Sequence, residues 1–138
     1  MPAKDSFHDI VKNALVKDGW KITHDPLILT FGRRDLYVDF GAELPIGAEK
    51  DGRKIAVEVK SFMGKSDLND FKNAMGAYIV YQSILRRIEP DRTLYLAIEK
   101  NIYDGIFSED IGDIVLEDFD VHIIIFEESK EVILKWLN

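Results

Sequence analysis

The hydrophobic period of this chain changes at Pro90, and that change constrains the fold more than any other feature. Before Pro90, apolar side chains recur at helical spacing over a segment that Ser66 can cap, which predicts one long helix. After it, residues 94–98 form a short apolar run of the kind found in a buried strand. The chain therefore combines a long helix with a buried strand close behind it.

The rest of the chain consists of further segments with helix or strand patterns and two segments that are less clear. The segment 101–119 is acidic and irregular, with room for one short helix, and residues 131–137 fit either a hairpin strand or a short helix. The remaining expected elements are a helix at about 5–18 and strands at 27–31, 36–40, 54–60 and 122–126.

The order α-β-β-β-α-β, followed by C-terminal strands, predicts a single α/β domain over residues 1–138 with a mixed central sheet flanked by helices. The three strands before the long helix are expected to form an antiparallel meander, with Asp51-Gly52 as a turn. No internal repeat or linker divides the 138 residues, which is a common length for one domain.

Composition excludes several classes of protein. No apolar run approaches the roughly 18 to 20 residues that cross a bilayer, and the first five residues turn charged where a signal peptide needs an apolar stretch. We therefore expect a soluble, cytoplasmic protein that does not bind membranes. The absence of Cys excludes disulfide scaffolds, thiolate metal sites and Cys nucleophiles.

The formal net charge of −7 bears on nucleic-acid binding. Proteins that grip DNA through their own surface present a basic face to the phosphates, so this chain is expected to bind DNA weakly or only in a complex. DNA chemistry stays compatible with the charge if an acidic metal site acts together with a cationic partner subunit.

The triplet Glu58-Val59-Lys60 is the most informative candidate for chemistry. Residues two apart on a strand share a face, so Glu58 and Lys60 point the same way while Val59 points into the core. Asp39 and Glu43 share a face of the preceding β-rich region, and a hairpin can bring them against Glu58. Carboxylates on adjacent strands suit a hard cation such as Mg²⁺, and a lysine beside it can orient the attacking water or stabilise charge on a phosphate.

Asp39, followed 19 residues later by Glu58-x-Lys60, resembles the PD-(D/E)XK superfamily of restriction-endonuclease-like enzymes. The resemblance implies that Asp39 and Glu58 hold Mg²⁺ or Mn²⁺ and that Lys60 positions the attacking water, with Asp39, Glu58 and Lys60 as the catalytic set. Val38 stands where the superfamily has proline, so the first metal ligand stays open. Asp39 is the first choice, Glu43 the second and Glu49 the third.

Linked motifs over nearly the whole chain narrow the resemblance to the XisH family. The family name implies control of the excision of the fdxN element, a programmed DNA rearrangement in heterocyst-forming cyanobacteria. It also implies a restriction-endonuclease-like fold and a companion protein, XisI. The motifs are Lys17-Asp18-Gly19-Trp20, Val38-Asp39-Phe40-Gly41-Ala42-Glu43, Ile55-Ala56-Val57-Glu58-Val59-Lys60-Ser61-Phe62, Leu94-Tyr95-Leu96-Ala97 and Lys135-Trp136.

One departure from the family pattern favours a second hypothesis. The long helix of the family tends to carry Gly-Gln before its aromatic residues, as in the Gln-xxx-Tyr motif of some nucleases, whereas this chain has Gly76-Ala77 and keeps Tyr81. The first hypothesis is a Mg²⁺-dependent endonuclease that acts with XisI. The alternative is a non-catalytic regulatory subunit that binds XisI or a site-specific recombinase.

Two further expectations concern residues outside this set. His8 lies beside Asp9 on the first helix, where a solvated face is expected, although a residue of this helix could reach the metal. The acidic chain also carries apolar side chains near the ends of its expected elements, so we expect an oligomer or a complex that covers them. These side chains are Tyr78, Tyr81, Ile84 and Trp136.

Overall fold

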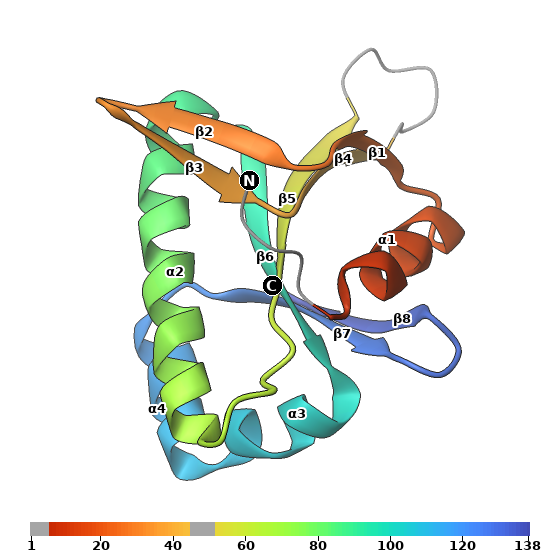
Figure 1. The fold of residues 1–138 in the computed structure, drawn as a ribbon, viewed down its shortest axis with the longest axis vertical. Coiled ribbons are helices and arrows are strands. Elements are labelled where there is room, and N and C mark those ends of the chain that lie inside the picture. The colour runs from red at the N-terminus through yellow and green to blue at the C-terminus, as the bar shows by residue number, and fades with distance from the viewer. Residues whose placement is uncertain (1–5, 45–51) are drawn as a thin grey trace.

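The structure is a computed structural model that describes residues 6–44 and 52–138. It contains a six-stranded sheet, a two-stranded hairpin and helices on both faces of the sheet, which confirms the expected fold class (Figure 1). The elements are α1 (His8–Lys17), β1 (Lys21–His24), β2 (Leu27–Phe31), β3 (Arg34–Val38), β4 (Phe40–Leu44), β5 (Arg53–Val59), α2 (Asp67–Ile88), β6 (Arg92–Glu99), α3 (Lys100–Asp104), the 3₁₀ turn η1 (Ile106–Ser108), α4 (Asp110–Asp118), β7 (His122–Glu127) and β8 (Val132–Leu137).

The large sheet has the strand order β1-β4-β5-β6-β7-β8. Strands β5, β6 and β7 are parallel, because α2 and then the α3 to α4 segment return the chain to the same end of the sheet. The outer pairs β1–β4, β4–β5 and β7–β8 are antiparallel. Residues 132–137 thus form the hairpin strand, which was one of the two alternatives for this segment.

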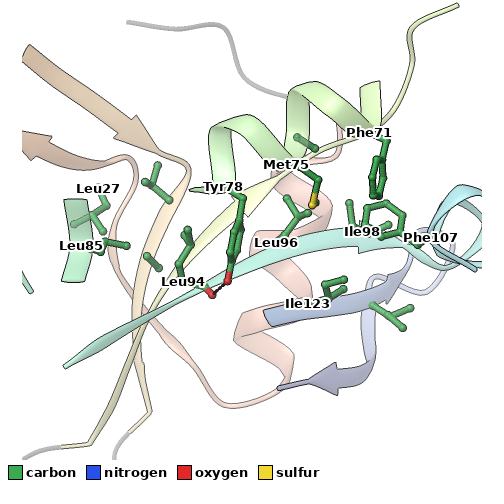
Figure 2. Packing of buried hydrophobic residues seen from close by; sticks show 14 of the residues in the cluster. Leu27, Phe71, Met75, Tyr78, Leu85, Leu94, Leu96, Ile98, Phe107 and Ile123 are labelled. Carbon is green, nitrogen blue, oxygen red and sulfur yellow. Dashed lines mark hydrogen bonds between the residues drawn. The ribbon is translucent and has the colours of Figure 1, made fainter. Parts of the chain in front are cut away.

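Helix α2 covers one face of the parallel strands. Ser66 caps it by accepting a hydrogen bond from the backbone N–H of Asn69, as expected. Its buried side chains pack on alternate residues of β6 and on β7 (Figure 2). The members of this cluster include Phe71, Met75, Tyr78 and Leu85 from α2, Leu94, Leu96 and Ile98 from β6, and Phe107 and Ile123.

Helix α1 covers the opposite face, where Val11 and Leu15 are fully buried. They belong to a second cluster with Phe40, Val57 and Tyr95 from the sheet. Because both faces of the central strands are covered, β5 and β6 are buried along almost their whole length. Period-two alternation of polar and apolar residues is consequently weak in these strands.

The expected three-stranded meander is wrong. Strands β2 and β3 form a separate hairpin, and β1, which was not expected as a strand, pairs with β4. The expected strand 36–40 is broken at Asp39, since Val38 is buried in the cluster under α2 while Phe40 is buried in the cluster under α1. Residues two apart in a regular strand share one face, so the chain has to turn between them.

The segment 101–119 holds more regular structure than expected, since α3, η1 and α4 all lie within or across it. The expected helix at 5–18 is shorter in the structure, His8–Lys17, because Ser6 and Phe7 form a turn before it; residue 5 lies outside the described ranges. Asp51 of the expected Asp51-Gly52 turn also lies outside them. No described helix is long and apolar enough to span a membrane.

The side chains that were expected to contact another subunit are instead mostly packed in the core of this chain. Tyr78 is fully buried, and Tyr81, Ile84 and Trp136 pack against the two clusters. These four residues therefore do not carry the argument for an oligomer, whose existence stays a prediction.

The hydroxyl of Tyr78 joins α2 to two strands. It donates a hydrogen bond to the carbonyl of Leu94 at 2.8 Å (Figure 2). It accepts one from the backbone N–H of His122 at 2.9 Å. A buried backbone group that loses its partner costs free energy, because no water replaces the lost bond.

We expect Tyr78→Phe to lower the free energy of unfolding by about 1–3 kcal/mol, since it removes both bonds and keeps the ring. Urea denaturation measures the change. Tyr103→Phe is the matched control, because the Tyr103 hydroxyl bonds to no described residue and its loss should change stability by less than about 0.5 kcal/mol. Equal effects of the two substitutions would contradict the assigned role of the Tyr78 hydroxyl.

Candidate active site

Asp39 occupies the turn between β3 and β4, where the chain passes from the hairpin into the main sheet. Its carboxylate oxygen Oδ2 accepts a hydrogen bond from the backbone N–H of Val59 at 2.8 Å. Its own backbone N–H donates to Oε1 of Glu58 at 3.3 Å. These two bonds hold Asp39 against the carboxyl end of β5, so the structure brings Asp39 and Glu58 together as expected.

Glu58 is buried, with only 6% of its surface exposed. Glu58 lies two residues after Ala56 on the same strand, so both side chains point to the face of β5 that α2 covers. The neighbouring Val57 and Val59 point to the opposite face, toward α1. Burial, the negative charge of Asp39 and a hydrogen bond between the two carboxyl groups together raise the pKa of Glu58 to about 8, against the opposing effects of Lys60 and of the bond from the Asp39 backbone N–H. The metal-free pair therefore holds a proton at neutral pH, which a bound cation would displace.

Lys60 follows the last residue of β5 and remains attached to the sheet, because its backbone N–H donates to the carbonyl of Ala97 at 3.3 Å. Its Nζ lies 3.4 Å from Oε2 of Glu58. The side chain is 35% exposed, so the ammonium group reaches solvent while it remains beside the buried carboxyl group. This geometry leaves Lys60 able to contact a molecule that approaches the carboxylates from outside.

Tyr81 of α2 borders the same site. The pKa of its hydroxyl is raised first by partial burial and then by the negative charges of Glu58 and Asp39. Ala77 lies one helical turn before it and is also half-buried, so a methyl group stands where the Gln-xxx-Tyr motif compared above would place glutamine. Asp39, Glu58, Lys60 and Tyr81 thus gather where the β3–β4 turn, the end of β5 and the middle of α2 meet.

Glu43 is not part of this group. The β4–β5 register places it opposite Lys54, four residues along β5 from Glu58, which corresponds to about 13 Å of strand. One cation cannot bind both glutamates over that distance, so the structure does not bring Glu43 to the expected metal site. Glu49, the third choice, lies outside the described residues.

His8 is buried rather than solvated, so the expectation for it is wrong. Its ring stacks on Phe40 with the ring centroids 4.4 Å apart, and its Nδ1 and Nε2 lie 3.1 Å and 2.9 Å from carboxylate oxygens of Asp9 and Asp25. Phe40 belongs to the cluster under α1, on the opposite face from Glu58. His8 therefore ties α1 to the turn after β1 and does not reach the carboxylate pair.

The donor set fits a hard divalent cation. Among residues 6–44 and 52–138 there is no group of three His, Asp or Glu side chains that could hold a metal by themselves. Mg²⁺, however, retains several waters and commonly binds one or two carboxylates together with oxygens of a phosphate substrate. Asp39 and Glu58 supply two adjacent carboxyl groups, and a cation between them would displace the proton of Glu58 and oppose the repulsion between the two carboxylates.

Comparisons with known proteins identify the family and the fold of the chain. The family model "XisH protein" matches residues 1–134. The crystal structure of an XisH family protein from Nostoc punctiforme PCC 73102 is 41% identical with a TM-score of 0.88, covering 97% of this chain and 100% of that one. The structure of an fdxN element excision controlling factor protein from Anabaena variabilis is 40% identical with a TM-score of 0.87, covering 98% and 100%.

A comparison with curated proteins gives no match. The family match nevertheless extends over nearly the entire sequence, and the two crystal structures share the fold from end to end. The chain belongs to the XisH family.

Proposed function

We propose that this protein is a Mg²⁺- or Mn²⁺-dependent DNA endonuclease that takes part in the excision of a DNA element. The observation that carries the proposal is the convergence of Asp39, Glu58 and Lys60 from separate parts of the chain at the carboxyl end of β5. The description of the Anabaena variabilis relative as an fdxN element excision controlling factor supports the DNA-processing role.

The proposed chemistry divides among the three side chains. Asp39 and Glu58 would hold the cation, which when bound neutralises charge on the phosphodiester and lowers the pKa of water. Lys60 is close enough to Glu58 to lie beside that phosphodiester, where its ammonium group orients the attacking water and stabilises the negative charge that develops. The backbone bonds of Asp39 keep the carboxylates in position before substrate binds.

A partner is part of this proposal. The chain carries a formal net charge of −7, which disfavours contact with a long stretch of DNA phosphates. We propose that an XisI-like protein supplies cationic surface in an oligomeric complex and that the isolated chain binds DNA weakly.

The alternative function is a non-catalytic subunit that binds XisI or a recombinase. The absence of glutamine at Ala77 and the acidic charge favour it. The two functions differ in what Asp39, Glu58 and Lys60 do, so the responses to divalent cations and to Lys60→Ala discriminate between them, whereas the pH dependence of stability tests the raised pKa of Glu58.

A divalent cation should stabilise the folded protein, because it relieves repulsion between Asp39 and Glu58. We expect millimolar Mn²⁺ or Mg²⁺ to raise the melting temperature by several degrees. Asp39→Asn and Glu58→Gln retain side-chain shape but remove a ligand charge, so each should abolish the shift. Glu43→Gln is the control and should retain it. If neither cation changes the melting temperature of the wild type, the result would favour the non-catalytic subunit.

Stability of the metal-free protein should fall as pH rises from about 5 to about 8. The pKa of Glu58 is raised in the folded state, so folded protein holds a proton that the unfolded chain releases, and this stabilisation is lost as pH passes through about 8. The stability of Glu58→Gln should decline less over this pH range, whereas the stability of the control Glu43→Gln should decline as in the wild type. Denaturant unfolding at several pH values measures it, and identical declines in wild type and Glu58→Gln would count against the raised pKa.

Lys60→Ala should separate binding from catalysis. It removes a cation from beside the metal ligands, so the stabilisation by Mn²⁺ should persist or increase. Cleavage of DNA by the complex should fall by about 10²-fold or more, because the lysine acts chiefly on the transition state. Gel assays of plasmid cleavage give the rate. Lys65→Ala, a change in the same exposed loop, should cleave like wild type.

A further inference from the structure

A cavity of about 220 Å³ lies next to the carboxylate pair, between the β5–α2 loop and the first turns of α2. Lys60 forms one side of it, Asp70 and Asn73 of α2 form another, and Phe62 and Met63 belong to the loop. Lys60 also contacts Glu58, so the cavity and the candidate active site share a side chain. If a substrate binds at the carboxylates, the chemical group next to its reacting atoms would therefore lie at the cavity.

The loop that forms this cavity is held in a defined shape. Phe62 has a φ of +55°, an uncommon value for a bulky residue, and its ring packs against Phe107 with the centroids 5.5 Å apart. The backbone N–H of Gly64 donates to Oδ2 of Asp70 at 2.9 Å. A Cβ atom at Gly64 would lie only 2.5 Å from Oδ1 of the same carboxylate, so a larger residue here would displace the Asp70 side chain. The wall of the cavity is thus formed before any ligand arrives.

Charge and polarity restrict what the cavity can hold. One cation, Lys60, and one carboxylate, Asp70, line the cavity and offset each other in charge, which favours a neutral group. The Asn73 amide presents both a donor and an acceptor. Met63 is 70% exposed, more than any other large apolar side chain among the described residues, and it offers apolar contact at the rim. The volume is below the 300–1,000 Å³ that is typical of pockets for larger ligands, so it suits a single ring system.

We propose that this cavity receives a nucleobase of the DNA strand, next to the phosphodiester held at Asp39, Glu58 and Lys60. The proposal rests on the proposed function, because that function places a nucleotide chain at Lys60. Asn73 would hydrogen-bond to the edge of the base and Met63 would cover its face. A base inside a duplex is stacked and paired, so the preferred substrate would carry an unpaired or extruded nucleotide at the cleavage position.

The test compares three DNA substrates that differ only at the nucleotide beside the cleavage position: fully paired, with an unpaired base, and with an abasic residue. Cleavage is measured with Mn²⁺ and binding with Ca²⁺ in the complex with the XisI-like partner. We expect the unpaired base to be bound and cleaved at least about tenfold better than the abasic residue. Equal binding and cleavage of these two substrates would overturn the proposal.

Two pairs of variants assign the effect to the cavity. Asn73→Ala and Met63→Ala should each reduce the preference for the base, whereas the controls Asn69→Ala and Leu68→Ala alter exposed residues nearby that do not line the cavity and should retain it. The two controls should also hydrolyse bis(4-nitrophenyl) phosphate at the wild-type rate. Loss of the preference in the controls to the same extent would overturn the assignment.

The same assays separate this proposal from the proposed function. Protein that hydrolyses neither DNA nor bis(4-nitrophenyl) phosphate refutes the endonuclease, and binding in Ca²⁺ then decides the cavity by itself. If the DNA with the unpaired base binds more tightly than the abasic DNA, and Asn73→Ala abolishes this difference, the result would support the cavity as a base site. Equal affinities would refute it.

Discussion

The placement of one carboxyl group, that of Glu58, governs the organisation of this molecule around its candidate site. Glu58 lies on a strand whose two faces are covered by helices, where a charged group is costly unless something compensates it. The structure surrounds it instead with a second carboxylate, Asp39, and offers one ammonium group, Lys60, at 3.4 Å. A layout optimised only for stability would place an apolar side chain here. The close placement of two carboxyl groups, one of them buried, is therefore the feature that a function has to explain.

The pair is fixed by the backbone rather than by flexible side chains. Asp39 accepts a hydrogen bond from the N–H of Val59 and donates its own N–H to Glu58, so the position of its carboxylate follows from the β4–β5 pairing. The helix that covers Glu58 is anchored in turn by the Tyr78 hydroxyl, which bonds to β6 and β7. Sites held on regular elements in this way are more precisely positioned than sites held on loops. The same precision extends to the cavity wall at Gly64 and Asp70.

The sequence predicts the fold class and the Glu58–Lys60 half of the site, because helical periodicity and the spacing of residues along a strand are local properties. It does not predict the break at Asp39, since residues 36–40 have the composition of a continuous strand and only the two separate cores require Val38 and Phe40 to face opposite sides. Glu43 was associated with Glu58 for the same reason, because its distance depends on the β4–β5 register. The burial of His8 depends on its contacts with Phe40 and Asp25, which lie far from it in sequence.

The fold is shared with XisH family structures, and the function rests on the site, because one fold supports many activities. The most direct test of the account is a crystal of the protein soaked in Mn²⁺, with the anomalous signal of the metal used to locate it. The account predicts a peak about 2.1 Å from carboxylate oxygens of both Asp39 and Glu58, with the remaining ligands supplied by water. Manganese bound elsewhere, with Asp39 and Glu58 still hydrogen-bonded to each other and no peak between them, would contradict it.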